Sequence, residues 1–143
     1  MLTAFACFVA GLLGTAAMTM ILFVPAWLGW GRIDVVRAVG SFISHDREHA
    51  LGPGLVLHFS IGILFAFAYW GVLAAVGLPL NVLTGIYIGA IHGIVIMLLV
   101  AIAILEHHPL QRYRDRGPMT GVAQVVGHLI YGGVVGAVFQ LIA

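Results

Sequence analysis

The sequence has very little charge and a single cysteine. Of its 143 residues, 8% are charged and 62% are hydrophobic; lysine is absent and the net charge is +1. A soluble domain cannot hide so much apolar surface inside itself, and so small a charge offers no basic field for nucleic acid. The lone Cys7 excludes a disulfide framework within the chain and a four-cysteine zinc site. We therefore expect a membrane protein that does not bind nucleic acid.

Long apolar stretches account for most of the chain. A bilayer core about 30 Å thick takes roughly 20 residues of α-helix. Four stretches reach this length without any Asp, Glu, Lys or Arg: residues 2–24, 55–77, 82–104 and 121–143. They predict an all-α membrane protein in which one transmembrane domain, residues 1–143, forms a four-helix bundle.

The arginines predict how this bundle is oriented. All six lie in residues 31–54 and 105–118, and the short connection 77–81 carries no charge. The positive-inside rule places arginine-rich loops in the cytoplasm, so we expect both termini and the short connection on the outer side. A connection this brief also predicts that helices 55–77 and 82–104 are antiparallel neighbours.

Part of the first charged loop is patterned as a helix. Apolar residues recur at helical spacing, with polar residues on the opposite side, as in helices that lie in the headgroup region. The apolar positions are Val35, Val36, Val39, Phe42 and Ile43. We expect a cytoplasmic amphipathic interfacial helix over residues 33–50.

The two halves of the chain show a faint internal similarity. An offset of 70 aligns His58 with His128 and Gly62 with Gly132, whereas an offset of 74 aligns helix 2–24 with helix 82–104. Each half is a helix, a charged loop and a returning helix, so a two-plus-two duplication would have its axis along the membrane normal. Chance alignment of apolar helices is the alternative.

Small residues predict which helix faces make contact. Gly85, Gly89 and Gly93 recur every fourth residue, and Gly132 and Gly136 repeat this spacing. Such ridges let helix backbones approach closely in a membrane. Since His92 lies beside the first ridge, we expect its side chain to face protein rather than lipid.

Three of the seven histidines lie inside predicted spans, at His58, His92 and His128. Ionisable groups there are costly and mark candidate functional sites, and imidazole is a common ligand of metals and haem iron. His58 and His128, each followed four residues later by glycine, are the pattern expected of an axial haem b pair, with His92 as a third ligand candidate. Alternatives are another transition metal, a proton or ion path, and simple hydrogen bonding between helices.

Two further groups of polar residues are candidates. Gln124, His128 and Tyr131 share one helix face and predict a polar seam. Residues 45–49 read His-x-x-Glu-His, the inverted zincin pattern, but a third ligand and a soluble cleft are lacking, which disfavours a protease. A looser cytoplasmic metal site would combine His45, His49, Glu106, His107 and His108, and a solvated charged surface is the alternative reading.

Several short motifs together resemble a family of small prokaryotic four-helix membrane proteins of unknown function. The motifs are Ala17-Met18-Thr19, Asp34-Val35-Val36-Arg37 before Gly40-Ser41, His58-x-x-x-Gly62 and Gly127-His128-x-x-x-Gly132. The resemblance implies the four-helix fold and a prokaryotic cytoplasmic (inner) membrane, and it supplies no activity.

No motif of a hydrolase, a nucleotide site or a di-iron carboxylate centre occurs, so we expect no catalysis. The expected function is a small non-catalytic subunit or accessory protein of an inner-membrane assembly, as a homo-oligomer or in a larger complex, whose intramembrane histidines hold haem b or a metal. The alternatives are a small transporter or proton-conducting bundle, and a scaffold or assembly factor without a cofactor.

Overall fold

The computed structural model describes residues 1–27, 34–114 and 119–143. Within these ranges all regular structure is helical. The helices are α1 (Leu2–Trp27), α2 (Val35–Ser44), α3 (Leu51–Ala75), α4 (Val82–Val100), the π-helix η1 (Ala101–Glu106), α5 (Gln111–Arg114) and α6 (Met119–Ile142). Two of the arginines used to predict orientation, Arg32 and Arg116, lie outside the described residues.

Four of these helices are long and apolar enough to cross a membrane. The qualifying segments are Leu2–Leu22, Leu51–Ala75, Val82–Ile104 and Gly121–Ile142. They coincide with the four predicted stretches to within a few residues, and the third runs from α4 into η1 without a break. The chain therefore has the architecture of a multi-pass membrane protein.

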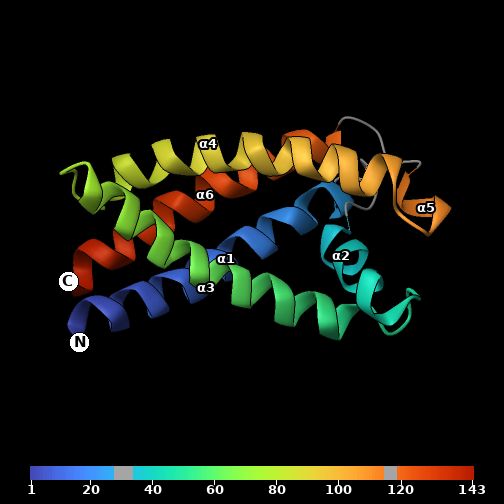
Figure 1. The fold of residues 1–143 in the computed structure, drawn as a ribbon, viewed down its shortest axis with the longest axis horizontal. Coiled ribbons are helices and arrows are strands. Elements are labelled where there is room, and N and C mark those ends of the chain that lie inside the picture. Colours follow the sequence, from blue (N-terminus) through green and yellow to red (C-terminus); the bar gives the residue numbers. More distant parts are fainter. Residues whose placement is uncertain (28–33, 115–118) are drawn as a thin grey trace.

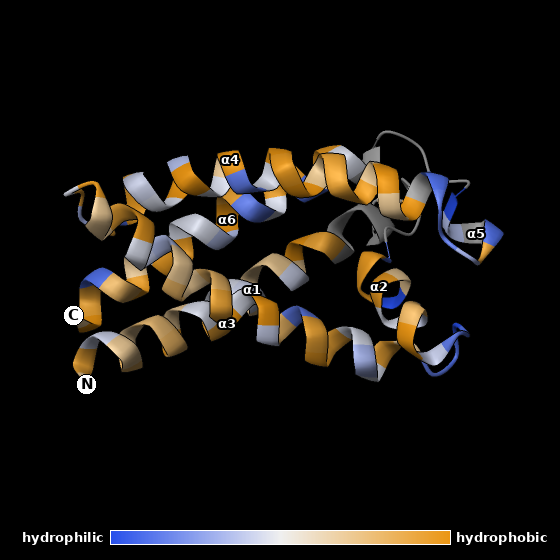
Figure 2. Cartoon of the chain, in the orientation of Figure 1, coloured by the Kyte–Doolittle hydropathy of each residue, from blue (hydrophilic) through white to orange (hydrophobic). Residues whose placement is uncertain are grey.

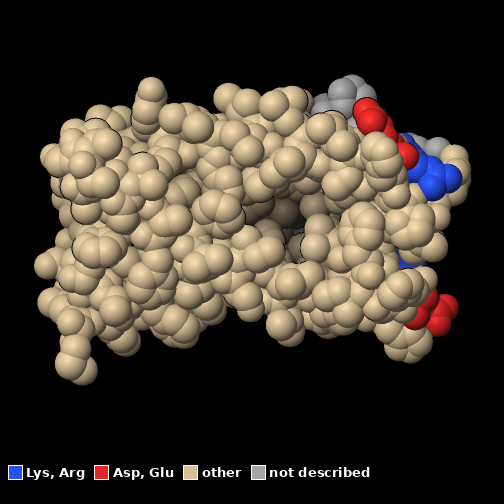
Figure 3. Space-filling view, viewed as in Figure 1, with Lys and Arg blue, Asp and Glu red and all other residues tan. Residues whose placement is uncertain are grey.

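The long helices form a bundle whose two ends differ in character. Helix α4 lies along α6, α6 along α1, and α1 along α3, while both chain termini lie at one end (Figure 1). At the other end lie α2 and α5, where hydrophilic stretches of the ribbon lie beside the mainly apolar α2 (Figure 2) and the visible Arg, Asp and Glu side chains gather (Figure 3). We call this second end the charged end.

Glycines allow two pairs of helices to touch through their backbones. A Cβ added to Gly85 of α4 would meet the carbonyl oxygen of Gly132 in α6, as the predicted ridge requires. In the other pair, a Cβ on Gly11 of α1 would meet the backbone of α3, and a Cβ on Gly62 would meet Thr15 Oγ1. The offsets of 74 and 70 relate Gly11 to Gly85 and Gly62 to Gly132, so both pairs use matched positions.

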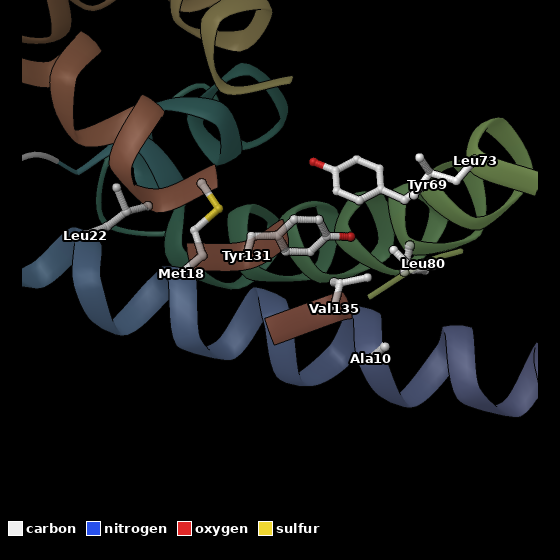
Figure 4. Packing of buried hydrophobic residues seen from close by; sticks show 9 residues of the cluster. Ala10, Met18, Leu22, Tyr69, Leu73, Leu80, Tyr131 and Val135 are labelled. Carbon is white, nitrogen blue, oxygen red and sulfur yellow. The ribbon is translucent and has the colours of Figure 1, made fainter. Parts of the chain in front are cut away.

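The core of the bundle lies where α1, α3 and α6 converge. Tyr69 and Tyr131 are each 2% exposed, and their rings meet edge to face with centroids 5.5 Å apart. Met18 and Val135 are buried in the same cluster, close to Tyr131 (Figure 4). This cluster fixes α3 and α6 relative to each other through aromatic contacts rather than through small residues.

The interfacial helix is shorter than predicted. Helix α2 begins after Asp34, whose side chain accepts a hydrogen bond from the Arg37 backbone N–H at 3.3 Å, and it ends at Ser44 instead of residue 50. His45 follows in the left-handed conformation, with φ of 60°, and its N–H bonds to Ser41 O. Helix α3 then begins at Leu51 rather than 55, because Pro53 lies in its first turn, where proline costs no hydrogen bond.

Helices α3 and α4 diverge from their short connection. Gly77 turns the chain with φ of 72°, and Asn81 starts α4 with a capping box shared with Thr84. The two helices then separate along their length, since the glycine face of α4 lies on α6 and few close contacts with α3 form (Figure 1). The prediction that they are neighbours therefore holds from the turn as far as His92, which contacts Phe65 and Tyr69 of α3, and not beyond it.

Candidate functional site

The divergence of α3 and α4 leaves a cavity of about 290 Å³ inside the bundle. Its walls also include residues of α1 and α6, and α2 covers it on the side of the charged end. Figure 3 shows a hollow on this face, between α4 and α3. Most of the lining is apolar; the polar side chains that line it are Thr15, His58, His92, Gln124, His128 and Tyr131.

The cavity brings together the three histidines predicted from separate helices. His58 and His128 each lie seven residues after the start of their spans, at Leu51 and Gly121, and His92 lies near the middle of the span Val82–Ile104. All three line the same cavity, so their side chains converge instead of facing unrelated neighbours. Their convergence follows from the α4–α6 and α1–α3 contacts, which turn these helix faces inward.

His92 lies at the centre of this group. Its Nδ1 is 2.9 Å from the Tyr69 hydroxyl, and its ring stacks on Phe65 with centroids 4.0 Å apart. The His128 ring meets it edge to face at 4.5 Å. Both polar groups are satisfied when the hydroxyl of Tyr69 donates to Nδ1, and this tautomer leaves the Nε2–H of His92 as an unpartnered donor.

His128 is fixed in a different tautomer. Its Nδ1 lies 2.7 Å from the backbone oxygen of Gln124, one turn earlier in α6. Because a carbonyl oxygen only accepts hydrogen bonds, Nδ1 must carry the proton, and Nε2 of the neutral ring carries a lone pair. The side chain is 7% exposed, so this lone pair lies within the bundle.

Two further side chains hold polar atoms without partners. Nε2 of His58 and the amide nitrogen of Gln124 have no hydrogen-bond partner among the described residues, and Gln124 is 2% exposed. A buried polar group without a hydrogen bond costs on the order of 1–3 kcal/mol. With Nε2 of His92, three unpaired nitrogens belong to side chains that line one cavity.

The remaining polar lining is satisfied by the protein itself. Tyr131 donates its hydroxyl to the backbone oxygen of Gly62, which ties α6 to α3, and Thr15 donates to Gly11 O at 2.7 Å. The predicted seam of Gln124, His128 and Tyr131 does share one wall of the cavity. Only Tyr131 of this seam makes a side-chain bond to another helix, so the seam is not a closed hydrogen-bond ladder.

The family of unknown function DUF6789 matches residues 1–143. The chain belongs to this family. No curated protein and no solved structure matches it. Family membership agrees with the resemblance found in the short motifs and gives the DUF6789 chain no activity, so any functional argument must come from the site itself.

The second site predicted in the DUF6789 chain, a metal site of five residues at the charged end, is not assembled. In the described part of the chain, no group of three or more His, Cys, Asp or Glu side chains could hold a metal ion. His49 pairs with Asp46 at 3.0 Å, and His107 lies 4.0 Å from Glu106. The separate His-x-x-Glu-His interpretation needed residues 45–49 on one helix face, but α2 ends at Ser44.

His108 of the predicted metal site has a structural role instead. It is fully buried, and its Nε2 lies 3.0 Å from the backbone oxygen of Ala38 and 3.1 Å from the hydroxyl of Ser41, both in α2. Its Nδ1 accepts the backbone N–H of Leu110 at 3.0 Å, so Nε2 carries the proton. His108 thereby holds α2 against the end of η1.

The sequence analysis did not single out Tyr69 and Phe65 as site residues. The sequence does contain a signal for both, because helical spacing places positions 58, 62, 65 and 69 of α3 on the same face as His58. The apolar face of α2, which includes Val36, Val39 and Phe42, was visible too, but its pattern indicated packing in the headgroup region and not a cavity wall. Its role depends on where α2 packs, and His108 sets that position from a remote part of the sequence.

Proposed function

We propose that this chain is a small non-catalytic subunit or accessory protein of a prokaryotic inner-membrane assembly, which binds a non-protein ligand at His58, His92 and His128. The observation that carries the proposal is the single cavity lined by these imidazoles, with three unpartnered nitrogens among apolar walls. Polar groups unpaired in a hydrocarbon region are costly, and a bound ligand would supply their partners.

The proposed orientation follows from charge. The described arginines, such as Arg37 and Arg47, lie at the charged end with α2 and α5. By the positive-inside rule this end faces the cytoplasm and both termini face outward. We also propose a two-plus-two duplication, supported by the matched glycine contacts of the two helix pairs.

Haem b or a transition metal, held by His58 and His128 with His92 as a further candidate, is one ligand class for this site. In its favour, the backbone bond at Nδ1 of His128 fixes the tautomer whose Nε2 can ligate a metal. Against a bare metal ion, the described residues provide no group of three or more ligands. A lipid-soluble organic molecule is the other class.

The test is the ligand content of the purified full chain, measured by visible absorption, elemental analysis and mass spectrometry of an organic extract. We expect a stoichiometric ligand that is lost in His58→Leu and His128→Leu and kept in His107→Leu, a matched exposed histidine outside the cavity. A Soret band or a metal would assign the first ligand class. A ligand-free protein whose folding is indifferent to His58→Leu and to His128→Leu would refute the proposal.

A proton- or ion-conducting bundle is the second candidate, favoured by the consecutive contacts from Tyr69 through His92 to His128. Proteoliposome flux that depends on His92 would support it over the binding role.

A further inference from the structure

The cavity opens at the side of the bundle, between α3 and α4, where the surface is apolar. Its lining includes exposed residues of two long helices, Ile61 of α3 at 45% and Leu99 of α4 at 54%, together with Ala103 of η1. Figure 3 shows a hollow on this face, between α3 and α4. A molecule dissolved in the bilayer could therefore reach the cavity between these helices without crossing the bundle.

The route from the charged end is covered by α2. Val35, Val36, Val39 and Phe42 of this helix line the cavity, and His108 fixes α2 through Ser41 and the oxygen of Ala38. A close backbone contact holds α2 from the other side, because a Cβ on Gly40 would meet the backbone of Gly54 in α3. Access from the hydrocarbon side is thus more open than access from water.

The polar atoms of the cavity define what the polar end of such a molecule must offer. Nε2–H of His92 and the amide nitrogen of Gln124 are donors without acceptors, and Nε2 of His128 is an acceptor. A ligand with carbonyl oxygens would accept from these two donors, and the reduced form of a quinone ring, in which hydroxyls replace the carbonyls, would donate to His128. Among the residues that the structure describes, the walls carry no Asp, Glu, Lys or Arg, so an anionic or cationic head finds no such counterion among them.

Size and wall shape favour a flat head of one ring. The volume of about 290 Å³ lies just below the range for pockets that enclose small molecules, roughly 300–1,000 Å³. Aromatic side chains, among them Phe42, Phe65 and Tyr131, supply faces and edges against which a planar ring can stack.

We propose that the ligand is a quinone-type lipid, whose ring carbonyl oxygens accept hydrogen bonds from His92 and Gln124 and whose apolar tail leaves between α3 and α4. This inference rests on the proposed function, because it names the organic ligand class of the same site. It requires no chemistry at the ring: the protein binds and orients the head, and the bilayer receives the tail.

Binding of decylubiquinone to the detergent-purified full chain, followed by titration calorimetry, tests the inference. We expect saturable binding of one quinone per chain, weakened about tenfold or more by His92→Leu and by Gln124→Leu, a loss equal to about 1.4 kcal/mol. The matched controls His107→Leu and Gln140→Leu lie outside the cavity and should bind as the wild type does. Equal binding by the cavity variants and the controls would overturn the inference.

A steric variant tests the access route without removing a polar group. Ala103→Trp places a large ring at the mouth and should abolish quinone binding, whereas Ala74→Trp, at an exposed position of α3 outside the lining, should not. Circular dichroism verifies that each variant keeps its helices. If the wild type binds no quinone but carries another ligand that depends on the histidines, the inference fails and the proposed function stands; if it carries none, both fail.

Discussion

The contact between α1 and α3 at Gly11 makes a sharp prediction about stability. A Cβ on Gly11 would lie 2.6 Å from the backbone Cα of Ile63, and ordinary contacts begin at 3.4 Å, so Gly11→Ala must separate the two helices locally by about 0.8 Å. Ile63 Cα cannot rotate away as a side chain could. A gap of this size removes a quarter to a half of the dispersion energy of each atom contact that is widened. Overpacking of this kind lowers stability by about 1–3 kcal/mol.

Gly71→Ala is the matched control. Gly71 lies inside α3, and a Cβ there would meet nothing within 4 Å. Both substitutions gain the same helix propensity, about 0.5–1 kcal/mol, so the difference between the two variants isolates the steric cost. We expect Gly11→Ala to be less stable than Gly71→Ala by about 1–3 kcal/mol.

The assay is reversible unfolding of the full chain in mixed micelles, followed by circular dichroism. Adding Ala66→Gly to the Gly11→Ala variant removes the second-nearest atom, at 3.1 Å, but leaves Ile63 Cα in place. The double variant should therefore recover little stability. If Gly11→Ala unfolded at the same midpoint as Gly71→Ala, the close helix contact would be disproved.

Two further predictions concern the ends of the bundle. Asn81→Ala removes the side chain that accepts the N–H groups of Leu83 and Thr84 at 3.0 and 3.1 Å, and should cost about 0.5–2 kcal/mol in the same unfolding assay, whereas Asn81→Asp should retain most of the stability. The His49 backbone N–H donates a hydrogen bond to Asp46 and lowers the pKa of that carboxyl. The bond to the carboxylate is therefore fully present above the ordinary Asp pKa of about 3.9, and it is lost as the pH falls through the lowered pKa. A carbon-13 NMR titration of Asp46 should give a midpoint below that ordinary value, and a midpoint at or above it would contradict the hydrogen bond.

The four long helices were predictable because their cause is local. Each span is a run of apolar residues without charge, and helix length follows from composition alone. The glycine spacing of α4 and α6 likewise indicated the face that makes contact, since a ridge of small residues is visible in the sequence. The inward position of His92 followed from the same spacing.

Helix ends and loop contacts were predicted less well. The apolar pattern favoured a helix to residue 50, but the left-handed turn at His45 ends α2 early, and residues 45–49 make their own local bonds. The metal site predicted at the charged end required five side chains to meet. One of them, His108, is instead engaged with α2, a contact between residues 67 and 70 positions apart that no local pattern shows.

The sequence by itself determined how many helices can span a bilayer, which faces carry glycine and which helices carry histidine, because these properties depend on neighbours along the chain. Only the tertiary structure decided that α4 lies along α6 and diverges from α3, and this divergence creates the cavity. It also decided that His58, His92 and His128 share that cavity with Gln124. The physical reason is that close backbone contact at glycines stabilises a helix pair along its whole length, whereas a short connection only holds the joined ends of α3 and α4 together. Packing, and not chain order, therefore selects the neighbours.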